Sequence, residues 1–575
     1  MSARAPSPER EVHLNTVELT APEAHLTTML RGLRTVFWAQ VRHLASACCV
    51  EDVLNGELLD RQQVPSYELA FAAAELLAAE IMLSRPAATS SDLRGRLAVT
   101  FVAELCRTLL ERLQRVALDI EDDAALLRKL AVDPDWHAVC RAVLSGRALD
   151  DTGRGVCECQ EEIGEVDLAP DLRLAQSEFR RFAAQVVMPL ATKIHRQDLT
   201  VPEELLGPLR EMGVFGLSIP ESFGGTANDE HKELMMMVVT EALSEASLAA
   251  AGSLITRPEI LARALLAGGT AQQKARWLPL IARGDPLCAV AITEPDFGSD
   301  VAGLQLKATR VEGGWLLDGA KSWCTFAGKV GLIMVVARTA SDRALGHRGL
   351  SLLLVEKPSY DGHSFEYRAS GGGRLTGKAI ATIGYRGMHS FDLSFEQLFV
   401  PEVNLVGEEG GIGKGFYFTM AGMVGGRMQT AARALGVMRA ALYAARRYAG
   451  DRKVFKLPLA DYSLTRAKIA RMAARFAGCR EMTYAVGRGD HGGDVRTEAS
   501  LIKLFACRSA EWLTREALQI HGGLGYAEET PVSRYFVDAR VLSIFEGAEE
   551  TLALKVVARD LFERSRKACI QGGAA

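Results

Sequence analysis

Strand-forming sequence is confined to one block of this chain, and helix-forming sequence lies on both sides of it. Between Leu287 and about Val400, short apolar or β-branched runs are bounded by glycine and charged residues, as strands commonly are. These runs are Cys288–Ile292, Trp315–Gly319, Leu332–Ala337, Leu350–Val355 and Phe391–Phe395. Outside the block, apolar residues recur every three or four positions, which predicts amphipathic helices. Helices, then strands, then helices predict an α+β protein with separate layers, not a doubly wound sheet.

The chain has 575 residues, enough for roughly three to four domains at ~150 residues each. We expect a helical N-terminal extension (1–165), a second helical domain (166–286), a β domain (287–402), a helical bundle (403–566) and a tail (567–575). In the extension, Ser66–Leu83 and Asp92–Leu113 have the clearest helical periodicity. Nothing there pairs a nucleophile with a base, so we expect it to serve in packing or oligomer contacts.

Composition narrows the class of protein. The chain is 48% apolar and 24% charged, ordinary values for a globular protein, and its net charge of −4 supplies no global field for nucleic acid. No apolar run approaches the ~20 residues of a membrane span. Met1–Pro8 lacks the apolar core of a signal peptide and is expected to be a disordered leader. The 11 cysteines show no zinc spacing with histidine. We therefore expect a cytoplasmic protein with reduced thiols, no membrane contact and no metal site.

Two stretches near the C-terminus carry candidate chemistry. Gln519–Tyr526 is a helix end that breaks into glycines, which can bring backbone N–H groups close to an anionic ligand. In Asp538–Gly547, an apolar run is interrupted by one carboxylate, Glu546. Desolvation of an acid raises its pKa toward the range useful for proton transfer. The ordinary alternative is a helix end with a solvated glutamate.

Together these stretches resemble the C-terminal signature of the acyl-CoA dehydrogenase family. Further segments between residues about 170 and 565 match the family in the right order: Met212–Gly216, Pro220–Gly225, Ala291–Asp300, Asp318–Thr325 and Arg427–Gly436. The resemblance implies the acyl-CoA dehydrogenase fold, namely an N-terminal helical domain, a middle β domain and a C-terminal four-helix bundle. Here an extra helical N-terminal domain would precede it.

The resemblance also implies the reaction, an FAD-dependent α,β-dehydrogenation of an acyl-CoA thioester. Glu546 would be the catalytic base that removes the α-proton while hydride passes to flavin N5. Some relatives carry their base where this chain has Gly426, so that role is left to Glu546. Electron-transferring flavoprotein would accept the electrons.

The resemblance also implies which residues bind FAD. Thr293 would bind the isoalloxazine, Trp323 would lie against it and Thr325 would donate toward N5; a turn residue and a core tryptophan are the ordinary alternatives for the first two. The full set is Ile292, Thr293, Ser299, Trp323, Thr325, Arg452, Phe455, Gln519, Gly522 and Gly523. Arg452 would reach the FAD pyrophosphate across a subunit interface, which implies a homodimer or a dimer of dimers. Departures at Ser463, Ala548 and Glu550 remove side chains that usually contact FAD.

The implied substrate is a short branched acyl-CoA. The extension, Asp300–Gly303, Ile383–Ser390 and Val541–Ala548 resemble family members that convert (2S)-methylsuccinyl-CoA to mesaconyl-CoA in the ethylmalonyl-CoA pathway. The free carboxylate of that substrate needs a buried cationic partner. Our hypothesis is Arg257, with Thr256; a surface arginine is the alternative. The substrate-side residues are Ser299, Thr256, Arg257, Arg427 and Gly547.

Smaller features leave other interpretations open. Gly425 and Gly426 would free space that suits a branched acyl group. Another short or branched-chain acyl-CoA dehydrogenase, an oxidase of the same fold and a non-enzymatic DNA-associated relative remain alternatives. The last would need a local basic surface, since the net charge does not supply one.

Overall fold

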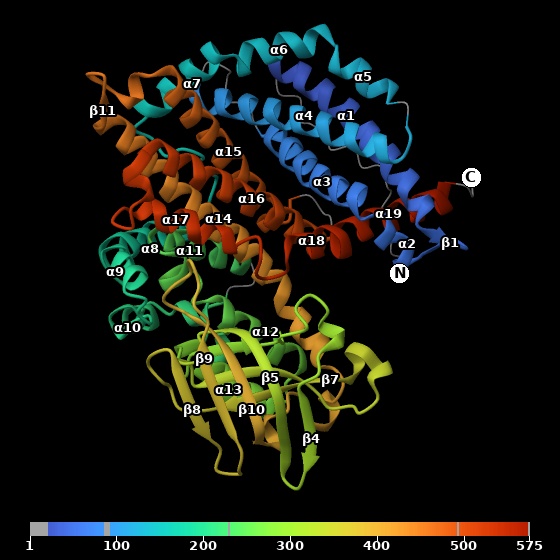
Figure 1. The fold of residues 1–575 in the computed structure, drawn as a ribbon, viewed down its shortest axis with the longest axis vertical. Coiled ribbons are helices and arrows are strands. Elements are labelled where there is room, and N and C mark those ends of the chain that lie inside the picture. Colours follow the sequence, from blue (N-terminus) through green and yellow to red (C-terminus); the bar gives the residue numbers. More distant parts are fainter. Residues whose placement is uncertain (1–20, 86–91, 123, 228–230, 491–493, 573–575) are drawn as a thin grey trace. The chain divides into compact units, whose positions relative to one another are not determined.

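The fold of the chain is seen in a computed structural model, which describes residues 21–85, 92–122, 124–227, 231–490 and 494–572 (Figure 1). The expected leader Met1–Pro8 lies outside the described residues. The chain forms two compact units. Unit one contains residues 1–167, 442–521 and 549–575, and unit two contains residues 168–441 and 522–548.

Unit one is helical apart from two short hairpins. The helices expected at Ser66–Leu83 and Asp92–Leu113 are confirmed, and the second continues to Asp119. The Asp92 side chain caps that helix by accepting a hydrogen bond from the Arg94 N–H at 3.1 Å. The helices are α1 (Ala21–Ala47), α2 (Gly56–Arg61), α3 (Gln63–Ser84), α4 (Leu93–Asp119), α5 (Ala125–Ala131), α6 (Pro134–Leu144), α7 (Gly146–Glu158), α15 (Ser463–Arg488), α16 (Val495–His521), α18 (Glu549–Thr551) and α19 (Arg559–Gly572). The hairpins are β1 (Cys49–Val50) with β2 (Val53–Leu54), and β11 (Lys453–Val454) with β12 (Leu457–Pro458).

Close helix packing joins the N-terminal extension to the C-terminal helices. A Cβ at Gly153 of α7 would lie 2.1 Å from the Arg466 carbonyl oxygen of α15. A Cβ at Gly478 of α15 would lie 2.3 Å from the Phe101 ring of α4. These glycines let the backbones approach, so the extension shares one core with α15 and α16 instead of forming a separate body.

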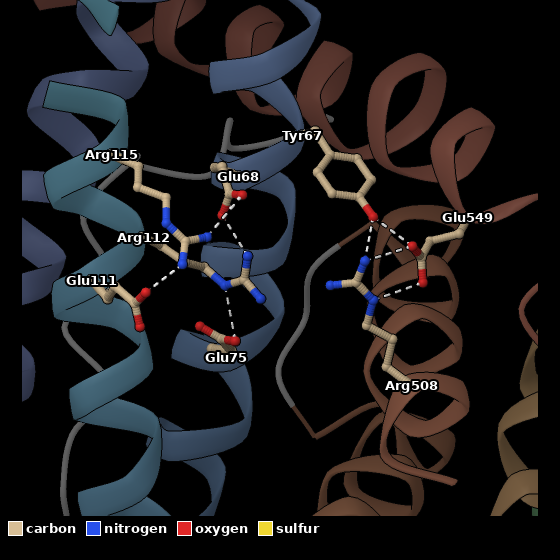
Figure 2. Close-up of polar contacts among 8 residues, drawn as sticks. All are labelled: Tyr67, Glu68, Glu75, Glu111, Arg112, Arg115, Arg508 and Glu549. Atoms are coloured by element: carbon tan, nitrogen blue, oxygen red, sulfur yellow. Dashed lines mark hydrogen bonds and ion pairs between the residues drawn. The ribbon is translucent and has the colours of Figure 1, made fainter. Parts of the chain in front are cut away.

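Polar contacts in unit one reinforce that packing (Figure 2). Within the extension, Arg112 of α4 donates to Glu75 of α3 at 3.0 Å. Arg508 of α16 donates to both carboxylate oxygens of Glu549, at 2.8 and 3.0 Å, and to the Tyr67 hydroxyl of α3. Tyr67 therefore links the extension to α16 and to the segment that starts at Glu549.

Unit two combines helices with one large sheet. The helices are α8 (Pro170–Phe182), α9 (Met188–Arg196), α10 (Glu203–Glu211), α11 (Lys232–Ala246), α12 (Thr256–Gly268), α13 (Ala271–Arg283) and α17 (Pro531–Val541), and α14 (Gly415–Asp451) continues into unit one from Leu442. The strands are β3 (Cys288–Ala291), β4 (Lys307–Val311), β5 (Gly314–Thr325), β6 (Leu332–Arg338), β7 (Leu350–Glu356), β8 (Ser364–Arg368), β9 (Arg374–Ala379) and β10 (Ser390–Pro401).

The eight strands follow the order β3-β6-β4-β5-β10-β9-β8, with β7 also paired to β6. Neighbouring strands are antiparallel except where β6 pairs with β3 and β4. One core cluster packs apolar residues of α12 and α13, among them Leu261 and Trp277, against Met334 of β6 and Leu352 of β7. The five expected strands are confirmed, while β4, β8 and β9 were not expected.

Two further findings concern the described residues only. Every cysteine among them is a free thiol, and several are buried. No helix in the described ranges has both the length and the apolar character needed to span a bilayer.

Candidate active site

Glu546 lies against Gly426 of α14. It is half-buried, and a Cβ on Gly426 would approach its Oε2 atom to 3.0 Å. Its φ of +55° is unusual for a residue with a side chain, and Gly547 follows at +100°. Strained backbone of this kind persists only where surrounding structure holds it, and it is found often at active sites. The turn directs a carboxylate toward α14, where a proton acceptor is expected.

Arg257 is the cation of this site. It is 7% exposed, in the first turn of α12, and its Nη1 donates to the Ser253 carbonyl and to the Tyr385 hydroxyl, both at 3.1 Å. Burial alone would lower the pKa of the guanidinium, but Tyr385 and Glu546 outweigh burial, and the net pKa is raised. Arg257 is therefore a fixed positive charge close to Glu546. The alternative of a surface arginine is wrong.

Tyr385, in the loop between β9 and β10, contacts Arg257. Its N–H donates to Asp538 Oδ1 at 2.6 Å, and its ring meets the Phe545 ring edge-on at 5.5 Å between centroids. It is buried, with φ of +59°. We did not single it out from sequence because Arg257 precedes it by 128 residues; it does lie within Ile383–Ser390, one of the segments that carry the resemblance.

Thr256, the second residue expected to contact the substrate, makes its side-chain hydrogen bond to α14 and not to Arg257. Thr256 is fully buried, and its hydroxyl donates to Gln429 Oε1 of α14 at 2.9 Å. Gln429 Nε2 is buried without a partner among the described residues. This amide is an unsatisfied donor, which burial makes costly.

The space expected beside Gly425 is not open. A Cβ there would lie 2.3 Å from Glu259 Oε1, and Glu259 is paired with Arg263 at 2.7 Å. Burial raises the pKa of Glu259 to about 7, although Arg263 opposes that change. Gly425 accommodates this buried ion pair, so the space expected for a branched acyl group is not provided by Gly425; for Gly426 it stays a prediction.

The two segments implied in flavin binding are joined at one end of the sheet. Thr293 follows β3, and its carbonyl accepts the Ser322 N–H of β5 at 2.8 Å. Trp323 and Thr325 come next on β5, and Thr325 Oγ1 lies 3.0 Å from Ser390 Oγ at the start of β10. Burial raises the pKa of the Cys324 thiol between them, and nearby Arg257 opposes that change. The flavin strands, the buried cation and Glu546 therefore belong to one site.

A buried ion pair supports the turn after β3. Lys321 Nζ donates to the Ile292 carbonyl at 2.7 Å and to Glu294 Oε1 at 2.8 Å. The Glu294 carboxylate also accepts the N–H groups of Gln305 and Leu306, at 2.7 and 2.9 Å. Burial lowers the pKa of Lys321 to about 8 against the opposing effect of Glu294, so it stays charged at neutral pH. Sequence reasoning missed this pair, although Lys321 and Glu294 stand inside the quoted motifs.

The residues present fit a flat aromatic cofactor. Trp323 keeps 55% of its surface exposed although it stands between buried neighbours on β5, and its φ is +58°. An indole exposed beside Thr293 and Thr325 is a surface that an isoalloxazine ring can cover. Such contact would remove apolar surface from water, so the arrangement is compatible with FAD.

The remaining expected residues are dispersed. In unit two, Arg427 and Gly547 are half-buried, and Ser299, Gly522 and Gly523 are exposed. Unit one holds Gln519 at the end of α16 and the hairpin of β11 and β12, where Arg452 is exposed and Phe455 is 92% exposed. Exposed hairpin residues suit a role toward another subunit, which stays a prediction.

Comparisons with known proteins match this geometry. Residues 169–285, 289–398 and 413–562 match the N-terminal, middle and C-terminal domains of acyl-CoA dehydrogenase, respectively. The chain belongs to the acyl-CoA dehydrogenase family. Its fold class is thereby confirmed, with the additional N-terminal helices, and it is an oxidoreductase that acts on acyl-CoA.

One related protein and two solved structures illustrate the similarity. The chain is 38% identical to the (2S)-methylsuccinyl-CoA dehydrogenase of Cereibacter sphaeroides over 80% of each protein. A glutaryl-coenzyme A dehydrogenase structure with glutaryl-CoA is 27% identical and has a TM-score of 0.63, covering 70% of this chain and 97% of that one. A structure described as the electron transferring flavoprotein of Acidaminococcus fermentans is 26% identical, with a TM-score of 0.61, covering 70% and 98%.

Proposed function

We propose that this acyl-CoA dehydrogenase uses FAD to oxidise (2S)-methylsuccinyl-CoA to mesaconyl-CoA. The observation that carries the proposal is Arg257, a buried guanidinium next to Glu546 and held by Tyr385. Among its relatives, the chain is 38% identical to a protein named for this activity. A dehydrogenase for an unsubstituted acyl chain has no need of a buried charge at its acyl pocket, because an unpaired buried charge is costly.

Arg257 and Tyr385 would bind the free carboxylate of the substrate. The guanidinium offers several donors in a planar arrangement that suits a carboxylate, and only Nη1 is engaged with Ser253 and Tyr385 in the contacts described above. The tyrosine hydroxyl, which accepts from Arg257, can donate its own proton to the ligand. Two charge-assisted contacts would then fix one end of the acyl group.

Glu546 would take the α-proton of the thioester. An α-proton is a poor acid, so the developing enolate oxygen needs hydrogen-bond donors; we assign the Glu546 N–H to this role. Ile292, Thr293, Trp323 and Thr325 would hold the cofactor ring. When bound, FAD supplies the acceptor for the hydride that leaves the β-carbon.

The wider assembly follows from the same proposal. Arg452 and Phe455 would complete the FAD site of a second copy, so the enzyme would be a homodimer or a dimer of dimers. Electron-transferring flavoprotein would reoxidise the cofactor, and a structure concerning such a flavoprotein is among the similar folds.

The test is a comparison of Arg257→Ala and Tyr385→Phe with the wild type on two substrates. A hydrogen bond to a charged group contributes about 1.5–3 kcal/mol, so Arg257→Ala should lower kcat/KM for methylsuccinyl-CoA by roughly ten- to a hundredfold. Tyr385→Phe should cost about fivefold, near the 1 kcal/mol of a typical hydrogen bond.

Butyryl-CoA is the matched control substrate because it lacks the second carboxylate. Both variants should retain the wild-type activity toward it, which would also show that they are folded and loaded with flavin. Equal losses on both substrates, or no loss on methylsuccinyl-CoA, would contradict the role of Arg257.

A further inference from the structure

Three side chains from separate segments of the chain lie close together in unit two. Asp198 follows α9, His363 precedes β8 and His389 precedes β10. His363 Nε2 lies 3.1 Å from His389 Nε2 and 3.6 Å from Asp198 Oδ2, and His389 Nε2 lies 3.0 Å from Asp198 Oδ1. The sequence predicts no metal site because nothing in the spacing of these residues indicates one.

The side chains of Asp198, His363 and His389 lie close enough together to hold a metal ion. Zinc binds imidazole nitrogen at about 2.0–2.1 Å and carboxylate oxygen at similar distances, so neighbouring ligand atoms of a tetrahedral site lie about 3.3 Å apart. His389 Nε2 lies 3.0 Å from Asp198 Oδ1 and 3.1 Å from His363 Nε2, close to that value, while the 3.6 Å distance from His363 Nε2 is to the other carboxylate oxygen, Oδ2. One ligand atom from each of the three residues can be chosen so that all lie within 4.8 Å of one another.

Hydrogen bonds alone satisfy this cluster poorly. A neutral imidazole has one N–H, and His389 Nε2 has two acceptors within reach, His363 Nε2 and Asp198 Oδ1. His363 Nε2 also has two neighbours, the Asp198 carbonyl oxygen at 3.0 Å and His389 Nε2. Arg386 is the nearest other cation, with Nε 3.7 Å from Asp198 Oδ1, and it also donates to the carbonyls of Thr382 and His195. It would compete with a metal for the carboxylate.

The backbone at the cluster is held in an uncommon conformation. Asp198 has φ of +52° and His389 has φ of +38°, and neither is glycine. Such residues cost free energy and are retained where the arrangement serves a purpose. His389 is 4% exposed, whereas Asp198 and His363 are 43% and 50% exposed, so a metal entering from solvent could keep a water ligand.

We propose that Asp198, His363 and His389 form a zinc site with water as the fourth ligand. Two imidazoles and a carboxylate are ligands that suit zinc. The metal would tie the loop after α9 to the starts of β8 and β10. The next residue after His389 is Ser390, which contacts Thr325, and the His389 carbonyl accepts the Phe326 N–H at 2.7 Å. The metal would thereby support the end of β5, and this role does not depend on the identity of the substrate.

The experiment uses the full-length flavin-loaded protein, stripped with a chelator and then given zinc chloride alone or cobalt chloride alone. Wild type should retain about one zinc per chain after gel filtration, measured by mass spectrometry of the metal. Cobalt should give the intense visible bands of tetrahedral coordination. Zinc should also raise the Tm, because a ligand that binds only the folded state stabilises it.

His363→Ala and Asp198→Asn should each lose bound zinc and the Tm increase, and both change half-exposed side chains, so folding is preserved. His25→Ala is the matched control. His25 Nδ1 lies 3.6 Å from Asp135, and this histidine–carboxylate pair does not belong to the group of Asp198, His363 and His389. It should bind zinc as the wild type does. Failure of the wild type to retain zinc, or retention by either ligand variant, would overturn the proposal.

Discussion

At the scale of single residues, the site depends on how closely Glu546 approaches α14. The carboxylate oxygen that would accept the proton faces Gly426, and a methyl group there would stand 3.0 Å from it. Because Oε2 is the end of a flexible side chain, the carboxylate can move by a few tenths of an ångström. Proton transfer is sensitive to such displacements, since reacting atoms must be closely aligned.

Gly426→Ala should therefore lower kcat with methylsuccinyl-CoA by roughly tenfold while leaving the free energy of unfolding nearly unchanged. Gly450→Ala, in the same helix, is the control because a Cβ there meets nothing within 4 Å. Steady-state kinetics and thermal unfolding of both variants check this prediction. If Gly426→Ala turned over as fast as Gly450→Ala, Glu546 would not need its present position.

At the scale of elements, α12 carries a buried acid whose ionisation opposes folding. Burial raises the pKa of Glu259 from its ordinary 4.5 to about 7, so between those values the folded chain binds a proton that the unfolded chain has lost. The contribution of Glu259 to stability consequently falls as pH rises from 4.5 to about 7. Glutamine does not ionise and would not show this loss.

The Tm difference between Glu259→Gln and wild type should thus shift in favour of the variant as pH rises through that window. Loss of the Arg263 contact would shift the Tm of the variant equally at every pH, and it would leave the slope of Tm against pH unchanged. Glu402→Gln, which removes an exposed partner of Arg310, is the control for the loss of a glutamate–arginine contact. Parallel curves for Glu259→Gln and the wild type would contradict the raised pKa.

The strand β5 depends on Lys321. Removing one partner of a buried ion pair leaves an uncompensated charge and costs about 3–5 kcal/mol, so Lys321→Ala should destabilise the protein by that amount and reduce its flavin content. Arg310→Ala, which breaks an exposed pair with Glu402, should cost about 0–1 kcal/mol. Urea unfolding and the flavin-to-protein absorbance ratio measure both effects. Equal effects of the two variants would show that Lys321 is not a support of the turn.

The elements that sequence could predict are those with an apolar signal. The central strands β6 and β7 are apolar runs and were expected, whereas β4, Lys-Ala-Thr-Arg-Val, is largely polar because most of its residues are exposed. The site divides in the same way. Arg257 and Glu546 stand out in their local sequence, but the contacts of Arg257 with Tyr385 and of Asp198 with His389 join segments more than a hundred residues apart. No local sequence pattern predicts such long-range contacts.

At the scale of the whole molecule, the extension is part of a core that includes C-terminal helices. Gly153 is where α7 contacts the α15 backbone, and a carbonyl oxygen cannot yield as a side chain can. Gly153→Ala should lower the free energy of unfolding by roughly 1–3 kcal/mol, the usual cost of overpacking. Gly146→Ala, in the same helix with nothing within 4 Å of its Cβ, is the control.

Urea unfolding followed by circular dichroism checks this prediction. We expect α1 to α7 to unfold together with α15 and α16 in unit one, because they share the core. Equal unfolding midpoints for Gly153→Ala and Gly146→Ala would mean that the close approach of α7 to α15 contributes nothing to stability.

Anaerobic reduction of the bound flavin, monitored by loss of its yellow colour, tests the proposed reaction most directly. Methylsuccinyl-CoA should bleach the wild type rapidly, and butyryl-CoA should do so far more slowly. Glu546→Gln should keep its flavin but lose bleaching by roughly 10²–10⁴-fold, the usual contribution of a general base. Bleaching by butyryl-CoA with none by methylsuccinyl-CoA would contradict the proposed substrate, and rapid bleaching of Glu546→Gln would contradict the proposed base.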